Sequence, residues 1–173
     1  MSDSICTADA CFAWLSARTP NGAALIHGSD AFPDIEGQVL FYQRRDGVFV
    51  VAQITGLPIE QDSCDPAIFA MHIHDGDSCT GNETDPFADA GTHDNPKDCP
   101  HPSHAGDLPP LFGNDGYAWG AVFTNRFAVS DVIGKTVIIH RQPDDFTTQP
   151  AGNAGAKIAC GVISEMKMSH TFF

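Results

Sequence analysis

The sequence predicts an all-β domain, an antiparallel barrel or sandwich whose chemistry lies in its loops. From residue 23 onward, short segments rich in β-branched and aromatic residues follow one another, separated by turn residues. Two irregular stretches, 75–116 and 141–156, interrupt them without any helical or strand periodicity. The first is rich in Gly, Pro, Asp and His, and a loop of that length inside a compact domain is functional or disordered.

The expected strands can be taken in chain order. The sequence Arg-Asp-Gly at 45–47 predicts a hairpin turn between the second and the third. Residues 8–18 predict a short helix with Thr7 as its N-cap. We divide the chain into an N-terminal extension, 1–22, and one β domain, 23–173. Strands are expected at 23–27, 37–43, 48–55, 68–74, 117–124, 135–140 and 157–164, with a last one at 166–173.

The composition limits the choice of partners. A chain of 173 residues can bury a full core as one domain. The formal net charge of −13 argues against nucleic acid, whose phosphates attract a basic surface. The same charge repels an anionic substrate, so such a substrate needs a local positive group. No apolar run approaches the roughly 20 residues that span a bilayer, so we expect no membrane partner.

The first residues carry no secretory pattern. The segment MSDSICTADACFAWLSART is acidic and lacks a basic region followed by an apolar stretch. We therefore expect a cytoplasmic protein, or an extracytoplasmic one if this sequence is a mature form.

Six of the eight histidines fall between residues 72 and 140, which suggests a site. His72 and His74, within FAMHIHDGDSC at 69–79, share one face of a strand, and the apolar residues between them face the core. The histidine face then points outward, so the pair either binds a metal or is solvated. With His140, at the end of the strand expected at 135–140, three imidazoles on strands suit copper or zinc.

The loop segment GTHDNPKDCPHPSHAGDLPPL supplies a second set of ligand types, His93, His101, His104 and Asp107. Three imidazoles and one carboxylate complete a tetrahedral zinc shell without an open position, as in structural sites. The alternative is a polar, proline-rich surface loop with incidental histidines. Four ligand-type residues within fifteen positions make that alternative the weaker one.

Five motifs, in this order, resemble the copper–zinc superoxide dismutase family over residues 37–163. MHIHDGDSC resembles the first copper-ligand strand followed by the bacterial-type cysteine, and THDNP the segment with the histidine that bridges the two metals. HAGDLPPL is similar to the end of the zinc loop, and VIIHRQPDD to the fourth copper ligand with its following aspartate. GNAGAKIACGVI matches the C-terminal signature.

The resemblance implies an eight-stranded antiparallel Greek-key barrel with two long functional loops and two metals. Asp144 is implied to accept hydrogen bonds from one copper and one zinc histidine. A disulfide between Cys79 and Cys160 is implied to tie the long loop to the barrel. The implied copper ligands are His72, His74, His93 and His140, and the implied zinc ligands are His93, His101, His104 and Asp107.

Two positions depart from the family pattern. Lys157 stands where members usually carry an arginine beside the copper channel, and a lysine is a flexible point charge without the bidentate fork. We expect it to attract superoxide but to position it less firmly. Arg141 is expected on the opposite face. The gap between His101 and His104 is far shorter than in most relatives, which bears on zinc geometry.

Four cysteines lie outside the implied disulfide. Cys64 and Cys99 are either a second disulfide, which would stiffen the short zinc loop, or free buried thiols. Cys6 and Cys11, in the extension, leave pairing, free thiols or an accessory metal site open.

The implied function is superoxide dismutation by copper redox cycling, with zinc in a structural and tuning role. His93 would release copper, take up a proton and help to deliver it, while Lys157 would focus the substrate anion. A homodimer is one candidate assembly. The alternative is a catalytically weak, superoxide dismutase-like protein for metal binding or copper handling. A zinc-only barrel would leave the strand histidines without a purpose.

Overall fold

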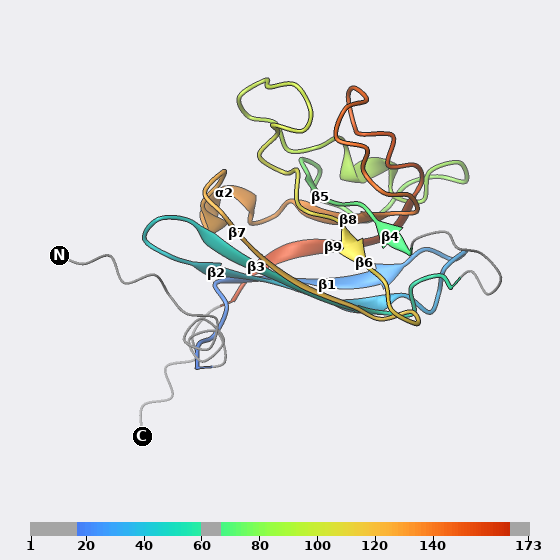
Figure 1. Ribbon diagram of the computed structural model, residues 1–173, viewed down its shortest axis with the longest axis horizontal. Helices are drawn as coiled ribbons and strands as arrows, with labels where there is room; N and C mark the ends of the chain where they lie inside the picture. Colours follow the sequence, from blue (N-terminus) through green and yellow to red (C-terminus); the bar gives the residue numbers. More distant parts are fainter. Residues whose placement is uncertain (1–16, 60–66, 167–173) are drawn as a thin grey trace.

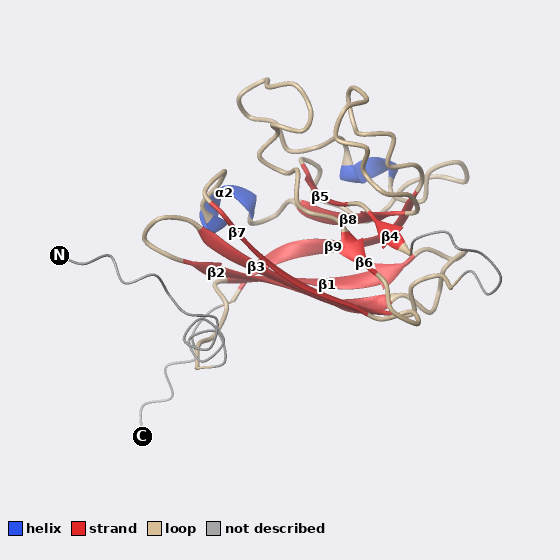
Figure 2. Ribbon diagram, in the orientation of Figure 1, coloured by secondary structure: helices blue, strands red, loops and turns tan. Residues whose placement is uncertain are grey.

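The regular secondary structure of the described residues is almost entirely antiparallel β-sheet (Figure 1, Figure 2). This computed structural model describes residues 17–59 and 67–166. Its helical elements are η1 Ala88–Ala90 and α2 Val129–Val132, and no helix of the described residues is long and apolar enough to cross a membrane. The strands are β1 Gly22–Gly28, β2 Glu36–Gln43, β3 Val48–Thr55, β4 Ile68–Phe69, β5 Met71–His74, β6 Leu111–Phe112, β7 Ala118–Thr124, β8 Thr136–His140 and β9 Lys157–Glu165.

Seven strands form one sheet in the order β5-β8-β9-β1-β2-β3-β7, with every neighbouring pair antiparallel. The two-stranded pair β4–β6 stands apart. Because β4 leads directly into β5 and β6 lies beside β7, this pair connects the two edges of the curled sheet. The chain changes edges after β3, after β5 and again after β7, which is a Greek-key arrangement. The expected antiparallel Greek-key barrel is confirmed.

The strand expected at 68–74 is divided at Ala70. The N–H of Ala70 donates to the carbonyl of Gln142 at 2.9 Å, while its own carbonyl accepts from the N–H of His140 at 2.9 Å. On one side β4 pairs with β6, and on the other β5 pairs with β8. The other expected strands up to residue 164 lie within one residue of their observed bounds. The helix at 8–18 and the strand at 166–173 fall outside the described residues apart from their ends.

The core lies inside the curl of the sheet. In β3 the sequence VFVVAQIT alternates between buried and more exposed side chains, as a strand with one face on a core requires. Burying one such aliphatic or aromatic side chain stabilises the fold by about 1.5–3 kcal/mol. The packed inner face therefore fixes the strands in place, and with them the side chains on the outer face of the sheet. The largest fully buried side chains include Phe41, Phe69, Ile26, Ile54 and Ile73.

Two long loops, 75–110 and 141–156, form a second layer over the outer face of β5 and β8, at the top of Figure 1. A small apolar cluster joins the first loop to the sheet, with Phe87 and Ala90 packed on Ile138. The Cys79–Cys160 disulfide belongs to the same cluster. The outer face of β5 and β8 is thus interior rather than solvated.

Candidate metal centre

Three histidines project from the outer face of two paired strands. His72 and His74 lie on β5 and His140 ends β8, where the β8–β9 ladder shifts its register. Irregularities of this kind re-aim side chains. All three histidines are buried, with His72 fully so. The histidine face points away from the barrel core, as expected, but it is not solvated, because the two long loops cover that side of the sheet.

A loop segment that binds along the free edge of β5 brings two further ligand residues, His93 and Asp107, to the site. Backbone hydrogen bonds join the loop segment 92–106 to this edge. Single β-bridges place His93 opposite His74 and Asp107 opposite His72. The loop therefore behaves locally as an extra strand, and its side chains arrive beside those of β5.

The first ligand group consists of four histidines whose ring nitrogens lie within 4.8 Å of one another: His72, His74, His93 and His140. The Nε2 atoms of His74 and His140 are 3.3 Å apart. The Nδ1 of His72 and the Nε2 of His93 are buried without a hydrogen-bond partner. Buried polar atoms are normally satisfied, so orphaned nitrogens converging on one point fit a metal. An all-imidazole set suits copper.

Hydrogen bonds to backbone carbonyls fix the tautomers in this group. The Nδ1–H of His74 donates to the carbonyl of Gly91 at 3.0 Å, and that of His140 to the carbonyl of Gly155 at 3.2 Å. Each Nε2 therefore keeps its lone pair for a metal. Burial lowers the pKa of His74 to about 2 and that of His140 to about 3, so both rings are neutral at pH 7.

The second ligand group is compact as well. Asp107 lies at its centre, with one carboxylate oxygen 2.8 Å from the Nδ1 of His93 and 3.3 Å from the Nδ1 of His104. Its other oxygen lies 3.2 Å from the Nδ1 of His101, which has no hydrogen-bond partner. Three imidazoles and a carboxylate suit zinc. His93 belongs to both groups, and its two ring nitrogens serve one group each. The members are His93, His101, His104 and Asp107.

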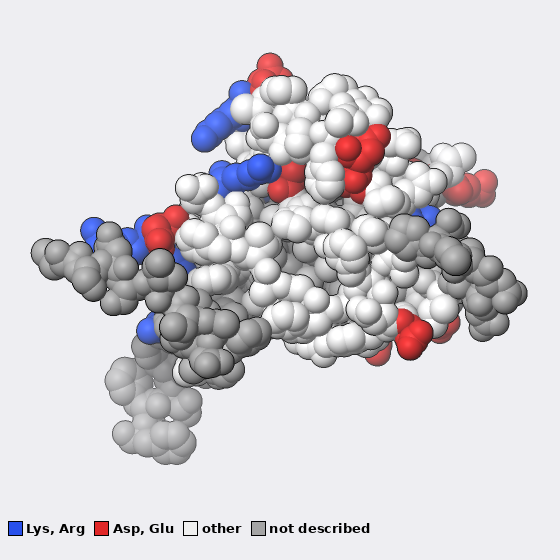
Figure 3. All heavy atoms as spheres, in the orientation of Figure 1, with Lys and Arg blue, Asp and Glu red and all other residues white. Residues whose placement is uncertain are grey.

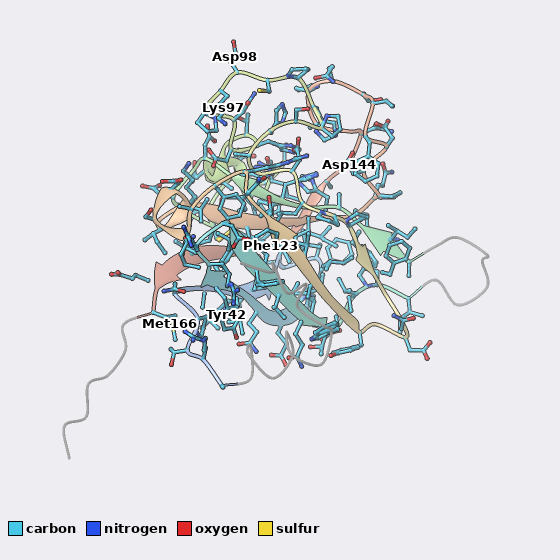
Figure 4. All side chains as sticks on the ribbon, turned by 60° about the vertical axis from the view of Figure 1, so that its left-hand side comes forward. Tyr42, Lys97, Asp98, Phe123, Asp144 and Met166 are labelled. Atoms are coloured by element: carbon cyan, nitrogen blue, oxygen red, sulfur yellow. A yellow bond between two sulfur atoms is a disulfide. The ribbon has the colours of Figure 1, made fainter. Side chains whose placement is uncertain are left out.

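Asp144 connects the two groups through a single carboxylate (labelled in Figure 4). Its Oδ2 accepts from the Nε2–H of His72 at 2.8 Å, and its Oδ1 accepts from the Nε2–H of His101 at 2.9 Å. Burial would raise the pKa of Asp144, but the hydrogen bonds from His72 and from the N–H of Phe146 hold it well below its usual range. The predicted contact is confirmed, and it leaves the Nδ1 atoms of both histidines for metals.

The comparison with known families agrees with this geometry. The family model of copper/zinc superoxide dismutase (SODC) matches residues 35–163. The chain belongs to the copper/zinc superoxide dismutase family.

The relatives of this superoxide dismutase-family chain include bacterial proteins. A superoxide dismutase [Cu-Zn] of Deinococcus radiodurans is 34% identical over 126 residues, which cover 62% of this chain and 69% of the relative. One of Caulobacter vibrioides is 31% identical over 144 residues, 73% of this chain and 77% of the relative. The Cu/Zn superoxide dismutase from Brucella abortus has the same fold, with a TM-score of 0.67 at 24% identity over 81% of this chain and 97% of its own.

In this family member the short turn between His101 and His104 is held by residues that the sequence did not single out. The Nη1 of Arg126 donates to the carbonyls of Pro102, His104 and Asp107 at 3.0, 3.1 and 3.2 Å. These acceptors are backbone atoms, which carry no sequence signal.

Two more side chains fix the ends of the zinc loop. The side-chain amide of Gln149 bonds both backbone groups of His101, accepting from N–H at 3.0 Å and donating to the carbonyl at 2.7 Å. The Nζ of Lys135 donates to Asp94, next to the shared His93, at 2.7 Å. The compressed turn therefore still completes a four-ligand group.

A cavity of about 550 Å³ opens beside the copper-type group of this dismutase-family site. His74, His93 and His140 line it, and so does Lys157. The Nζ of Lys157 donates to Asp85 Oδ2 and to the carbonyl of Phe87, both at 2.9 Å. Lys157 therefore lies beside the copper-type group, as expected, but its ammonium group is hydrogen-bonded to Asp85 and to Phe87. Arg141 lines a different cavity, as expected.

The structure confirms the implied disulfide and decides between the two alternatives for Cys99. Cys79 and Cys160 form the implied disulfide, with Cα atoms 5.7 Å apart. The thiol of Cys99 is free, so the second disulfide with Cys64 is not formed, and Cys64 itself lies outside the described residues. The amide of Asn95 already closes this turn by donating to the carbonyl of Cys99 and accepting from its N–H. Cys6 and Cys11 also lie outside the described residues.

Proposed function

We propose that the protein converts two superoxide anions and two protons into dioxygen and hydrogen peroxide. The observation that carries the proposal is the pair of orphaned nitrogens, His72 Nδ1 and His93 Nε2, in a histidine group beside an open cavity. Copper, held by His72, His74, His93 and His140, would supply the one-electron exchange, and zinc, held by His93, His101, His104 and Asp107, would fix His93.

The chain's own residues supply the surroundings of this chemistry. His93 has one ring nitrogen, Nδ1, held by Asp107, while its Nε2 lies in the copper-type group at the cavity. That Nε2 is the atom at which a proton is held and passed to the reduced substrate. Lys157 places a positive charge on the wall of the same cavity, against the repulsion of the whole chain.

A second candidate function is copper binding or delivery with slow turnover. The observation that favours it is the ion pair of Lys157 with Asp85, which compensates the charge that would attract an anion. The copper-type group does not distinguish the two functions, because both require it.

The test is a dismutation assay on protein loaded with copper and zinc, with a chelator present to remove free copper and the metal-free protein as background. We expect activity well above that background, since the copper-type group lies beside an open cavity. His140→Asn should abolish it, whereas His27→Asn, on an exposed site of β1, should not. Activity no higher than that of the metal-free protein, with copper still bound tightly, would establish the second candidate instead.

We also propose that two copies associate through an aromatic face made of Phe112 on β6 and of Trp119, Ala121 and Phe123 on β7. These aromatic side chains are exposed by 63, 45 and 43%. Figure 3 shows no Lys, Arg, Asp or Glu over the centre of this face. With a net charge of −13 on each copy, an uncharged face is where two copies repel least.

Sedimentation equilibrium tests this assembly. We expect a dimer for the unchanged protein and a monomer for the double variant Phe112→Glu with Phe123→Glu, because each interface would then contain four carboxylates. A monomer at all concentrations for the unchanged protein would refute the assembly.

A further inference from the structure

The cavity beside the copper-type group has one charged pair on its wall. Among the described residues that line it, Lys157 is the only Lys or Arg and Asp85 the only carboxylate. Their Nζ and Oδ2 atoms are 2.9 Å apart, and the lysine side chain is 14% exposed against 39% for the aspartate. The lysine is therefore the more buried partner, and its ammonium group is fixed rather than free to follow a ligand.

The carboxylate is held in place by its own turn. The Oδ1 of Asn82 accepts from the N–H groups of Thr84 and Asp85 at 3.0 and 3.1 Å. Asp85 in turn accepts from the N–H of Phe87 at 3.0 Å, and the Phe87 ring is buried against the sheet. The aspartate thus reaches Lys157 as part of an ordered turn, across 72 residues of sequence.

This arrangement has two opposite effects on a small anion in the cavity. The bonds to Asp85 and to the Phe87 carbonyl use two of the three ammonium hydrogens and orient the third. The negative charge of Asp85, however, compensates most of the field that Lys157 would exert. The loss of attraction outweighs the gain from a fixed ammonium group. Asp85 cancels a full charge, whereas the Phe87 carbonyl would hold the ammonium group even without Asp85.

We propose that Asp85 is a positioning residue that sets the anion affinity of the site by fixing Lys157 and masking its charge. The proposal rests on the proposed function, since it takes a small anion as the cavity's ligand. It assigns to residues 82–87 the role of limiting how strongly the cavity attracts substrate.

Azide provides a measurement that does not depend on turnover. It is titrated into copper- and zinc-loaded protein, and its dissociation constant is read from the visible spectrum. Asp85→Asn keeps an oxygen acceptor for Lys157 but removes the charge, so we expect azide to bind about fivefold more tightly. The matched control is Asp89→Asn, which changes the net charge equally in an exposed carboxylate that bonds Thr80 instead.

Two further variants test whether the charge of Asp85, rather than a change in the conformation of the 82–87 turn, alters azide affinity. Asp85→Glu should restore affinity close to that of the unchanged protein, since the charge returns. Lys157→Gln should weaken azide binding several-fold, because Asp85 is then uncompensated, and adding Asp85→Asn to it should recover most of the loss.

The rate constant for superoxide should follow the azide affinity of each variant and fall more steeply with salt in Asp85→Asn than in the unchanged protein. Azide binding to Asp85→Asn that is no tighter than binding to Asp89→Asn would overturn the proposal. An inactive protein in which Asp85→Asn still binds azide more tightly would refute the proposed function and leave this inference standing.

Discussion

The two ligand groups meet at His93 but are built in different ways. In the copper-type group, three of four histidines stand on β5 and β8, which are joined by a backbone ladder. In the zinc-type group, all four ligands come from one loop segment, 93–107. Backbone hydrogen bonds hold the two ends of that segment on β5, but the turn between them, which carries His101 and His104, is fastened by side chains, chiefly those of Arg126 and Asp144.

The difference shows where each group is vulnerable. A ladder distributes its support over many backbone hydrogen bonds, so no single substitution removes it. A loop held by a few side chains loses its geometry when one of them is shortened. We therefore expect single substitutions outside the ligands to separate the two groups, with zinc affected more than copper.

The largest expected effect is the loss of folding stability of the metal-free protein at acidic pH, which comes from histidines of the copper-type group. His74 and His140 are neutral in the folded protein because burial lowers the pKa of each, to about 2 and about 3. In the unfolded chain both take up protons below about pH 6.5. The unfolded state then binds more protons, so stability falls as pH falls, by about 4 kcal/mol between pH 7 and 5.

Urea unfolding of the metal-free protein at several pH values measures this loss. His74→Gln removes one of these two histidines and should reduce the loss by about 2 kcal/mol. If the free energy of unfolding is the same at pH 7 and pH 5, this prediction is wrong. Burial would then not lower the pKa of the histidines on β5 and β8.

The next effect concerns the carboxylate that both groups share. Asp144→Ala removes the acceptor of His72 and His101, and partners of this kind contribute about 10–100-fold to metal affinity. We expect zinc to lose more than copper, because His101 sits on the loop. Competition with chelators gives both constants. Asp145→Ala, an exposed neighbour that bonds only within its own turn, is the control; equal losses in the two variants would exclude the bridging role.

The smallest effect isolates the loop. Arg126→Ala leaves three carbonyls of the 102–107 turn without their donor and should weaken zinc binding about tenfold, while copper binding stays within a factor of two. Arg126→Lys keeps one donor and should give an intermediate zinc constant. A parallel loss of both metals would show that the two groups are not supported independently.

The strands and ligands could be predicted because their signals are local. The alternation in β5 placed His72 and His74 on one face, and the motif order supplied Asp144 and the Cys79–Cys160 pair. The burial of these histidines could not be read from the strand, because it depends on a layer formed by residues 75–110.

The supports of the site were missed for a different physical reason. Arg126 binds backbone carbonyls, which every residue has, so no residue pattern marks its partners. Asp85 is recognisable as the partner of Lys157 only once the turn at 82–87 has folded onto the sheet. The short spacing between His101 and His104 could be read from the sequence, but the side chains that hold this turn in a ligand geometry could not.

The Cys79–Cys160 bond has a consequence for the maturation of the protein. It closes a loop with a sequence separation of 81. A cross-link of that span lowers the conformational entropy of the unfolded chain and so stabilises the folded state by about 4.5 kcal/mol. The strands that carry His72, His74 and His140 pair without it, but the wall that carries Asp85 is anchored through it. The redox state of this cysteine pair therefore bears more directly on the cavity wall that carries Asp85 than on the paired strands that carry the copper-type histidines.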